Sequence, residues 1–301
     1  MKYLSPTSIR LFSDDPELFY LRYIAKNRQP REPQTLPMSI GSAFDAFVKS
    51  YLYGVCVGKG DGQFELRTLF EEQVEECNWD WAWENGKSLF EEYKRVGCLG
   101  DLMIELKQAV GEPRFEVTVN SEVEGVPLLG KPDVFFINKT GTRVVYDWKV
   151  NGYCGKALKS PMPGYVKLRD KGQVKAHKDC HLLLYKGVMI NAATWLTGPW
   201  ADQLTIYSWL LGEEVGSEGV VFGVDQICGG PRLRFATHRL RVQPEYQYNL
   251  LSLVKHVWES VESNWIFRDL SQEDSVARGL LLEGEADFEG LDREDEMREI
   301  C

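Results

Sequence analysis

The stretch "GKPDVFFINKTGTRVVYDWKVNGY", residues 130–153, contains two short apolar runs on either side of a turn-like segment, "NKTGT". Aromatic and β-branched residues dominate both runs, and a short polar segment with a glycine between two such runs is typical of a β-hairpin. An aspartate stands at the outer end of each run, and a lysine follows the second aspartate by two positions. We therefore expect a hairpin with charged side chains at its open end.

The spacing of the two aspartates predicts that they face each other. If Thr140 is the midpoint of the turn, Asp133 lies seven residues before it and Asp147 seven residues after it. Residues equidistant from a hairpin turn lie opposite each other, with Cβ atoms about 5 Å apart. Because side chains alternate between the faces of a sheet, Lys149 shares a face with Asp147 while Trp148 points away.

Two carboxylates and one ammonium group at the same place suggest a metal site. Two like charges this close repel each other unless a cation lies between them. Ligand sets made only of oxygen suit hard cations such as Mg²⁺ and Mn²⁺. The alternative is that both aspartates only end their strands, and a bulge in the hairpin would shift their register.

Composition gives a broad class for the chain. It has 301 residues, 44% of them hydrophobic, which is enough for a packed core in one large domain or two modest ones. The first ten residues contain no apolar signal segment, and no apolar run is long enough to span a bilayer. The seven cysteines are scattered without a CxxC pair, which is typical of reduced thiols. We expect a soluble, cytoplasmic protein without membrane partners.

The net charge of -10 is unevenly distributed. Residues 269–301 hold twelve Asp and Glu against three Arg, so the rest of the chain is close to neutral, and we expect an acidic, mobile tail there. Residues 156–186 are basic, and such a stretch can bind phosphates even on an acidic protein, although a solvated loop is the alternative. The candidate nucleic-acid-binding residues are Lys156, Lys167, Arg169, Lys171, Lys175 and Lys178.

The rest of the chain alternates between helical and extended patterns. Ser5 before Pro6 and Asp15 before Pro16 predict the starts of two short helices, since Ser and Asp cap helices and Pro suits the first helical position. A helical stripe over residues 40–53 follows, and further helices are expected at 64–110, 198–212 and 244–265. Strands are expected at 114–137, 143–150, 219–227 and 232–242, whereas 153–198 is expected to be an irregular basic insertion. This order predicts one α/β domain, residues 1–268, with a mixed sheet flanked by helices.

The sequence Pro-Asp, then thirteen residues, then Asp147-Trp148-Lys149 resembles the motif of the PD-(D/E)xK nuclease superfamily. Residues 5–24 resemble the N-terminal helices of its RecB-like exonuclease branch. The stretch "IGSAFDAFV", residues 40–48, resembles the helix that follows them, with Asp45 where many members have a histidine metal ligand. Glu116 matches a glutamate on the first strand of the sheet, and "QLTIY", residues 203–207, resembles the Gln-xxx-Tyr motif of that branch. The resemblance covers roughly residues 5–212.

The resemblance implies a restriction-endonuclease-like core and a Mg²⁺- or Mn²⁺-dependent DNA exonuclease of the recombination or repair type that phages encode. The implied metal ligands are Asp133, Asp147, Asp45 and the main-chain carbonyl of Val150. Lys149 would position or help deprotonate the attacking water, with a pKa lowered beside the dication. Gln203 and Tyr207 would orient the nucleic acid or the lysine, and Glu116 completes the implied catalytic set.

Many RecB-like nucleases carry an iron–sulfur cluster, and we expect none here. The position of its first cysteine holds Asp15, before Pro16, and the end of the chain offers only Cys301. The expected partner is linear, end-bearing DNA, and a recombination partner protein or a homo-oligomer is compatible with the motifs. Two alternatives remain open: a structure-specific endonuclease, and a non-catalytic nucleic-acid-binding or assembly subunit that keeps the nuclease fold.

Overall fold

The computed structural model describes residues 1–26, 28, 32–58, 62–152, 161–162, 165–175, 182–185, 188–191, 198–229 and 232–270. Contacts within the chain define two compact units, one formed by residues 1–31 with 252–301 and the other by residues 32–251. Most of the expected acidic tail, from residue 271 on, lies outside the described residues. No helix within the described ranges is long and apolar enough to cross a membrane.

The first unit contains α1 (Pro6–Asp14), α2 (Pro16–Tyr23) and the end of α8 (Pro244–Ser263). The predicted helix starts are confirmed: Ser5 accepts a hydrogen bond from the Ser8 amide at 3.2 Å, and Asp15 accepts one from the Leu18 amide at 2.9 Å. These caps satisfy amide groups that have no partner within their own helix. The aromatic rings of Phe12, Phe19 and Phe267 pack together in the core of this unit.

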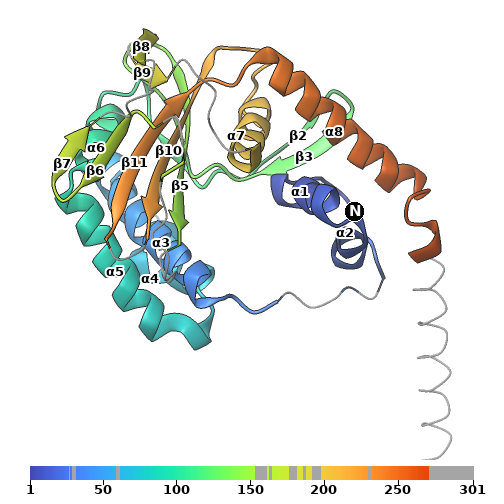
Figure 1. Ribbon diagram of the computed structural model, residues 1–301, viewed down its shortest axis with the longest axis horizontal. Coiled ribbons are helices and arrows are strands. Elements are labelled where there is room, and N and C mark those ends of the chain that lie inside the picture. Colours follow the sequence, from blue (N-terminus) through green and yellow to red (C-terminus); the bar gives the residue numbers. More distant parts are fainter. Residues whose placement is uncertain are drawn as a thin grey trace, which may run out of the picture. The chain divides into compact units, whose positions relative to one another are not determined.

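The second unit is built on a nine-stranded mixed sheet with the main order β1-β4-β5-β10-β11-β6-β7 (Figure 1). The pairs are antiparallel except for β5 with β10 and β9 with β11, which are parallel. The expected mixed sheet is confirmed. Its strands are β1 (Arg114–Phe115), β4 (Val134–Ile137), β5 (Arg143–Asn151), β6 (Lys167–Asp170), β7 (Gln173–Lys175), β8 (Leu182–Tyr185), β9 (Val188–Asn191), β10 (Val220–Cys228) and β11 (Arg234–Leu240). A separate hairpin pairs β2 (Val119–Val123) with β3 (Val126–Gly130).

Helices flank the sheet, as expected. The helices on one side are α3 (Leu36–Cys56), α4 (Leu66–Gln73), α5 (Trp79–Arg95) and α6 (Cys98–Lys107), while α7 (Gly198–Leu210) lies on the other (Figure 1). The 3₁₀ turn Gly62–Phe64 lies between α3 and α4, and the 3₁₀ turn Glu76–Asn78 lies between α4 and α5. Consecutive residues of β5 show the two faces: Trp148 donates a hydrogen bond to Tyr93 of α5, and Lys149 donates one to Gln203 of α7. The alternation predicted around Trp148 is therefore confirmed.

A large apolar core lies between the sheet and helices α3 to α6. Phe44 and Val48 of the predicted helical stripe are fully buried in it, and Phe47 is 7% exposed. Burying each such side chain contributes about 1.5–3 kcal/mol, so this core fixes α3 against the sheet. Tyr51, at the end of the stripe, is 38% exposed and contributes less than the pattern suggested.

The prediction that residues 153–198 are irregular was wrong for part of this segment, because it contains β6 to β9. β6 and β7 form a hairpin, and Lys171 and Gly172 at its tip have φ values of 50° and 76°. Two successive positive φ angles are typical of a tight turn whose twist matches that of the strands. β6 also pairs with β11. The sequence of β6 lacks a clear apolar alternation, and its backbone pairing with the sheet makes it a strand.

Candidate active site

The β4–β5 hairpin has the register that the sequence predicts. Val134 pairs with Tyr146 and Ile137 with Arg143, so the centre of the hairpin is Thr140. The side chain of Asn138 accepts hydrogen bonds from the amides of Thr140 and Thr142, at 3.0 and 2.8 Å, and closes the turn. This register places Asp133 opposite Asp147.

The carboxyl groups of Asp133 and Asp147 lie close enough for each to perturb the pKa of the other. Burial raises the pKa of Asp147 well above its ordinary value, and the negative charge of Asp133 adds to this effect. Burial would also raise the pKa of Asp133, but the positive charges of Lys49 and Lys149 outweigh it, so that pKa is lowered. The two acids thus share a small buried space in which their pKa values are driven apart.

Lys149, Gln203 and Tyr207 form a continuous hydrogen-bonded chain beside this pair. Lys149 Nζ donates to Gln203 Oε1 at 2.8 Å, and Gln203 Nε2 donates to the Tyr207 hydroxyl at 2.9 Å. Gln203 and Tyr207 lie one turn apart on α7, so a single helix face presents both side chains. Lys149 also forms an ion pair with Asp147. The chain links α7 to the open end of the hairpin.

Neighbouring carboxylates determine the electrostatic setting of Lys149 in the protein alone. Burial lowers the pKa of this lysine, but the charges of Asp147 and Asp133 outweigh burial, so the pKa is raised above its ordinary value. Lys149 is therefore a charged hydrogen-bond donor in the protein alone. The family resemblance implies that the pKa of Lys149 falls beside a bound dication. That fall requires the positive charge of the dication to exceed the effect of the neighbouring carboxylates.

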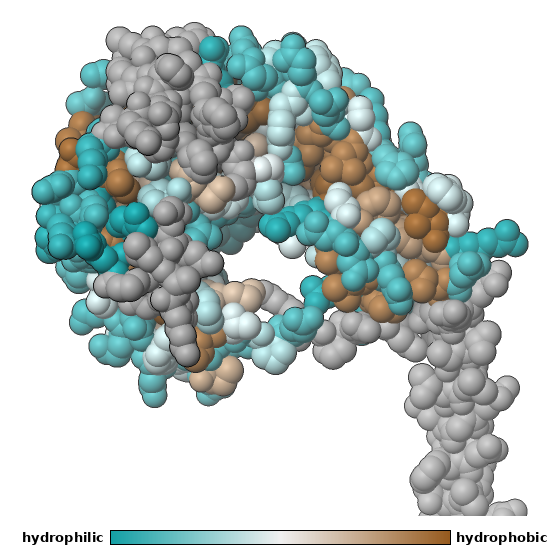
Figure 2. Space-filling view, in the orientation of Figure 1, coloured by the Kyte–Doolittle hydropathy of each residue, from teal (hydrophilic) through white to brown (hydrophobic). Residues whose placement is uncertain are grey.

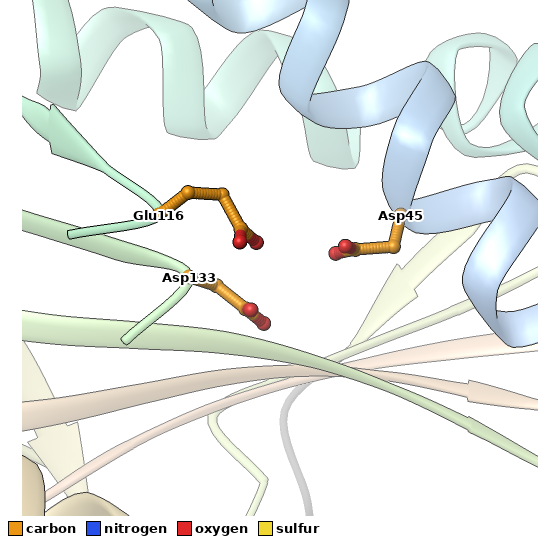
Figure 3. Close-up of side chains that lie close together, drawn as sticks. All are labelled: Asp45, Glu116 and Asp133. Carbon is orange, nitrogen blue, oxygen red and sulfur yellow. The ribbon is translucent and has the colours of Figure 1, made fainter. Parts of the chain in front are cut away.

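A second acidic group lies next to Asp133. Asp45 of α3, Glu116 after β1 and Asp133 before β4 point toward one another (Figure 3), and one carboxylate oxygen of each lies within 4.8 Å of the others. Glu116 has a φ of 52°, and its amide donates to the Asp133 carbonyl at 3.2 Å. Glu116 was expected on the first strand, whereas it lies one residue past the end of β1, where the left-handed backbone turns its side chain inward.

Lys49 is the principal residue of the site that sequence reasoning missed. Its ammonium group forms ion pairs with Asp45, Glu116 and Asp133, the last at 2.8 Å, and its side chain is 2% exposed. Burial lowers the pKa of Lys49, but the charges of Asp133 and Asp45 outweigh burial, so the pKa is raised. Asp45 and Lys49 are four residues apart in a helix, a spacing that favours an ion pair, and this was the available signal.

Asp45 keeps a raised pKa in spite of Lys49. Burial raises the pKa of this carboxyl to about 6, the charge of Lys49 opposes the rise, and the negative charge of Asp133 supports it. The positive charge of Lys49 therefore does not fully offset the burial of Asp45.

The remaining candidate ligand, Val150, continues β5 opposite Ile227 of β10. A Cβ at Gly41 of α3 would lie 3.9 Å from the Val150 Cβ, so the Val150 side chain faces α3. Asp45 is one helical turn further along the same helix. Val150 thus lies close to the segment of α3 that carries the acidic cluster.

The basic residues do not gather around the carboxylates. Lys167 and Arg169 of β6 both contact Asp101 of α6, at 2.9 Å for Lys167, and Arg169 is largely buried. In the sheet order β6 is three strands from β5, about 14 Å at the usual strand spacing. Lys171 and Lys175 lie in the β6–β7 hairpin, over which Figure 2 shows a hydrophilic surface. Lys156 and Lys178 lie outside the described residues.

Comparison with known proteins agrees with this geometry. Residues 3–176, more than half of the chain, match the family model described as the PD-(D/E)XK nuclease superfamily. The chain belongs to this superfamily. The matched range includes Asp133, Asp147 and Lys149. Membership of a nuclease superfamily implies a nucleic acid as the substrate class.

Among solved structures, a candidate exonuclease from Eubacterium rectale is 14% identical, with a TM-score of 0.46, and the alignment covers 86% of this chain and 80% of that one. The protein SSO0001 is 10% identical, with a TM-score of 0.26, and the alignment covers 82% of this chain and 86% of that one. Curated protein sequences give no significant match.

Proposed function

We propose that this protein is a divalent-metal-dependent DNA exonuclease of the RecB-like branch, with a role in recombination or repair. The observation that carries the proposal is the Asp133–Asp147 carboxyl pair, joined through Lys149 to Gln203 and Tyr207. The hairpin supplies the first three residues, and α7 supplies Gln203, which follows Lys149 by 54 positions. Ordinary strand ends do not require such a connection.

The donor set fits a hard dication. The proposed ligands are all oxygens, from Asp133, Asp147, the Val150 carbonyl and Asp45, whose carboxylate the ion would share with Lys49, and such sets suit Mg²⁺ or Mn²⁺. Asp147 Oδ2 is buried and forms an ion pair with Lys149. Because Asp133 brings a second carboxyl group to the same buried place, a dication there would add the positive charge that one ammonium group does not supply. When bound, the metal supplies Lewis-acid polarisation of the phosphate and activation of water.

The chain's own residues provide orientation and charge. Lys149 is protonated and donates at the side of the carboxyl pair, where it can hold a phosphate oxygen or a water molecule in line. Gln203 fixes the lysine through its amide oxygen, and Tyr207 fixes Gln203. Burial also raises the pKa of Tyr207, which keeps its hydroxyl neutral. Gln203 and Tyr207 are therefore positioning residues, whereas Asp133, Asp147 and Lys149 carry the reaction.

The proposed substrate is linear DNA with accessible ends. The support is the ordered set of RecB-like positions, Asp45, Asp133, Asp147 with Lys149, and Gln203 with Tyr207, which the second unit brings together around one hairpin mouth. Lys171 and Lys175, on the exposed β6–β7 hairpin, are proposed to contact backbone phosphates away from the reacting bond.

One observation favours a second function, that of a non-catalytic nucleic-acid-binding subunit. Lys49 places a positive charge among Asp45, Glu116 and Asp133 and stabilises the cluster without any metal. A nuclease fold that no longer needed a cation would benefit from such a lysine. The intact Asp133, Asp147 and Lys149 set argues for retained activity.

A nuclease assay on matched DNA substrates tests these functions. End-labelled linear duplex, closed circular duplex and linear single-stranded DNA are each incubated with Mg²⁺, Mn²⁺ or EDTA. The proposal expects metal-dependent release of nucleotides from the ends of linear DNA, with circles left intact. Cutting of circles indicates an endonuclease instead. DNA binding without turnover in either metal supports the non-catalytic subunit and overturns the proposed activity.

A further inference from the structure

The ammonium group of Lys49 is enclosed by three carboxylates from three separate segments. Asp45 lies one turn earlier in α3, Glu116 follows β1, and Asp133 precedes β4. An ammonium group has three N–H donors and no acceptor. Each donor can therefore be directed at one of the three carboxylates, which leaves none for substrate or solvent.

This arrangement is buried and interlocked. The Lys49 side chain is 2% exposed and the Glu116 side chain 5%. If Lys49 were withdrawn, the remaining basic partner of Glu116 would be Lys131, whose side chain is half exposed. Removing one member of a buried, hydrogen-bonded ion pair is strongly unfavourable, because the other charge is left without compensation. Lys49 is thus held in place by the same charges that would attract a metal.

The formal charges of the site indicate how many cations it can take. Four carboxylates, Asp45, Glu116, Asp133 and Asp147, face three ammonium groups, Lys49, Lys131 and Lys149, which leaves one negative charge. One divalent cation changes this formal charge from −1 to +1, whereas two would change it to +3 in a site where only Lys131 is half exposed. Uncompensated charge in a buried site is costly, so the balance favours a single dication.

The position left for that dication is on the other side of Asp133. Within the described residues, the buried Asp147 Oδ2 contacts one ammonium group, that of Lys149, whereas the Glu116 carboxylate contacts two, those of Lys49 and Lys131. Asp133 contacts both groups of residues, with Oδ1 toward Lys49 and Oδ2 toward the Trp148 amide at 3.3 Å. Asp133 therefore borders two cation positions. Lys49 fills the first, and the second lies beside Asp147.

We propose that Lys49 permanently occupies one of the two cation positions of a two-metal type site, so that the protein binds one divalent cation, between Asp133 and Asp147. Two-metal nucleases place two ions about 3.5–4 Å apart around shared carboxylates. Here a lysine of the chain takes the place of one ion. This inference rests on the proposed metal-dependent function, and it specifies the number and position of the ions.

The number of bound Mn²⁺ ions tests the inference without reference to activity. Free Mn²⁺ is followed by electron paramagnetic resonance while the full-length protein is titrated, and calorimetry gives an independent count. We expect one ion per wild-type chain. Two ions per chain would overturn the inference but leave the proposed function standing, whereas no binding at all would overturn both.

Substitution of Lys49 tests its role directly. Lys49→Met removes the charge at nearly constant length, and we expect the variant to bind two Mn²⁺ ions. Lys131→Met is the matched control, because it removes the other basic partner of Glu116 from a half-exposed position, and it should still bind one ion. A single ion in Lys49→Met would show that the lysine does not occupy a cation position. Circular dichroism and thermal unfolding, in EDTA and in Mn²⁺, establish folding, and Mn²⁺ should raise the midpoint more for Lys49→Met than for wild type. If Lys49→Met does not fold in either medium, the wild-type count and the ligand variants below decide the question.

A single bound ion could also arise if Mn²⁺ displaced Lys49 from its carboxylates. Substitution of the expected ligands distinguishes this case from the proposed one. If the ion lies between Asp133 and Asp147, Asp147→Asn should weaken Mn²⁺ binding by at least about 10-fold, in the range typical for residues that support a metal. Glu116→Gln should change it by less than about 3-fold, since Glu116 faces the lysine and not the ion. The opposite order would show that Mn²⁺ displaces Lys49, and it would overturn the proposal.

Discussion

Asp133 and Asp147 lie opposite each other at the mouth of the β4–β5 hairpin, where the negative charge of Asp133 helps to raise the pKa of Asp147. Neither residue is exposed to solvent as an ordinary strand end would be: Asp147 is 4% exposed, and the side chain of Asp133 is 19% exposed. Two acids held together in this way have little use in folding. A cation between them would relieve their repulsion, which is why the proposed metal is placed there.

Replacing either acidic partner should therefore abolish turnover while the fold remains. For Asp147→Asn, which keeps the shape of the side chain, we expect the rate of DNA hydrolysis to fall by at least about 100-fold, in the range expected when a positioned acid or base group is removed. End-labelled linear DNA with Mg²⁺ measures the rate. Far-ultraviolet circular dichroism and an unchanged elution volume serve as the folding control. Full activity in this variant would show that Asp147 takes no part in the reaction.

The Lys149–Gln203–Tyr207 chain predicts graded effects. Lys149→Ala should lower kcat by about 10²–10⁴-fold, because it removes the charged donor itself. Gln203→Ala should lower kcat by about 10–100-fold, as a group that positions another does, and Tyr207→Phe by less. Single-turnover assays at saturating DNA separate these effects from binding. Equal decreases in all three variants would mean that the three residues do not act in this order.

The raised pKa of Asp45 predicts a pH-dependent stability of the metal-free protein. Its ordinary value is 3.8 and burial raises it to about 6, so the folded protein holds this proton more tightly than the unfolded chain. As the pH rises from about 4 to 6, the unfolded chain ionises first and the free energy of unfolding falls. Above pH 6 this contribution is constant. Urea unfolding in EDTA at a series of pH values measures the trend.

Asp45→Asn provides the comparison for that measurement. The variant cannot ionise at this position, so its free energy of unfolding should vary less with pH between 4 and 6 than that of wild type. Carboxyl groups that do not interact with Asp45 titrate equally in both proteins and cancel in the difference. Parallel curves for the two proteins would show that Asp45 is not perturbed in solution.

Two glycines predict opposite effects of the same substitution. A Cβ at Gly130, at the end of β3, would lie 2.7 Å from side-chain atoms of Leu210 and Tyr207 on α7. Gly130→Ala should therefore destabilise the protein by about 1–3 kcal/mol through overpacking, and also lower activity by moving the helix that holds Gln203. Gly54→Ala, in α3 with nothing within 4 Å of the added Cβ, should stabilise by roughly 0.5–1 kcal/mol. Chemical denaturation gives both values.

The basic residues of the β6–β7 segment should fall into two classes. Lys171→Glu with Lys175→Glu should weaken DNA binding and reduce the salt slope by about 1 for each phosphate that the hairpin no longer neutralises. Lys167→Met and Arg169→Met should instead lower stability, because both side chains are paired with Asp101. Fluorescence anisotropy at several salt concentrations measures the first effect, and thermal unfolding measures the second. An unchanged affinity and salt slope in the Lys171/Lys175 variant would remove this hairpin from the DNA-binding surface.

The sequence by itself determined the parts of this protein that depend on local periodicity and short spacing. The symmetric distance of Asp133 and Asp147 from Thr140 was enough to predict their pairing, because a hairpin turn transmits register directly to its strands. Alternation predicted the opposite faces of Trp148 and Lys149, and cap residues predicted the starts of α1 and α2. The family motif then indicated which chemistry such a hairpin serves.

Only the tertiary structure decided which charges meet at the hairpin's mouth. Sequence reasoning gave no role to Lys49, because its burial among Asp45, Glu116 and Asp133 depends on how α3 packs against the sheet. Lys167 and Arg169 read as free basic residues, yet the order of the strands places them beside Asp101 instead of the carboxylates. Ion pairs between segments far apart in sequence carry no local period, because their partners are chosen by packing of the whole sheet and its helices.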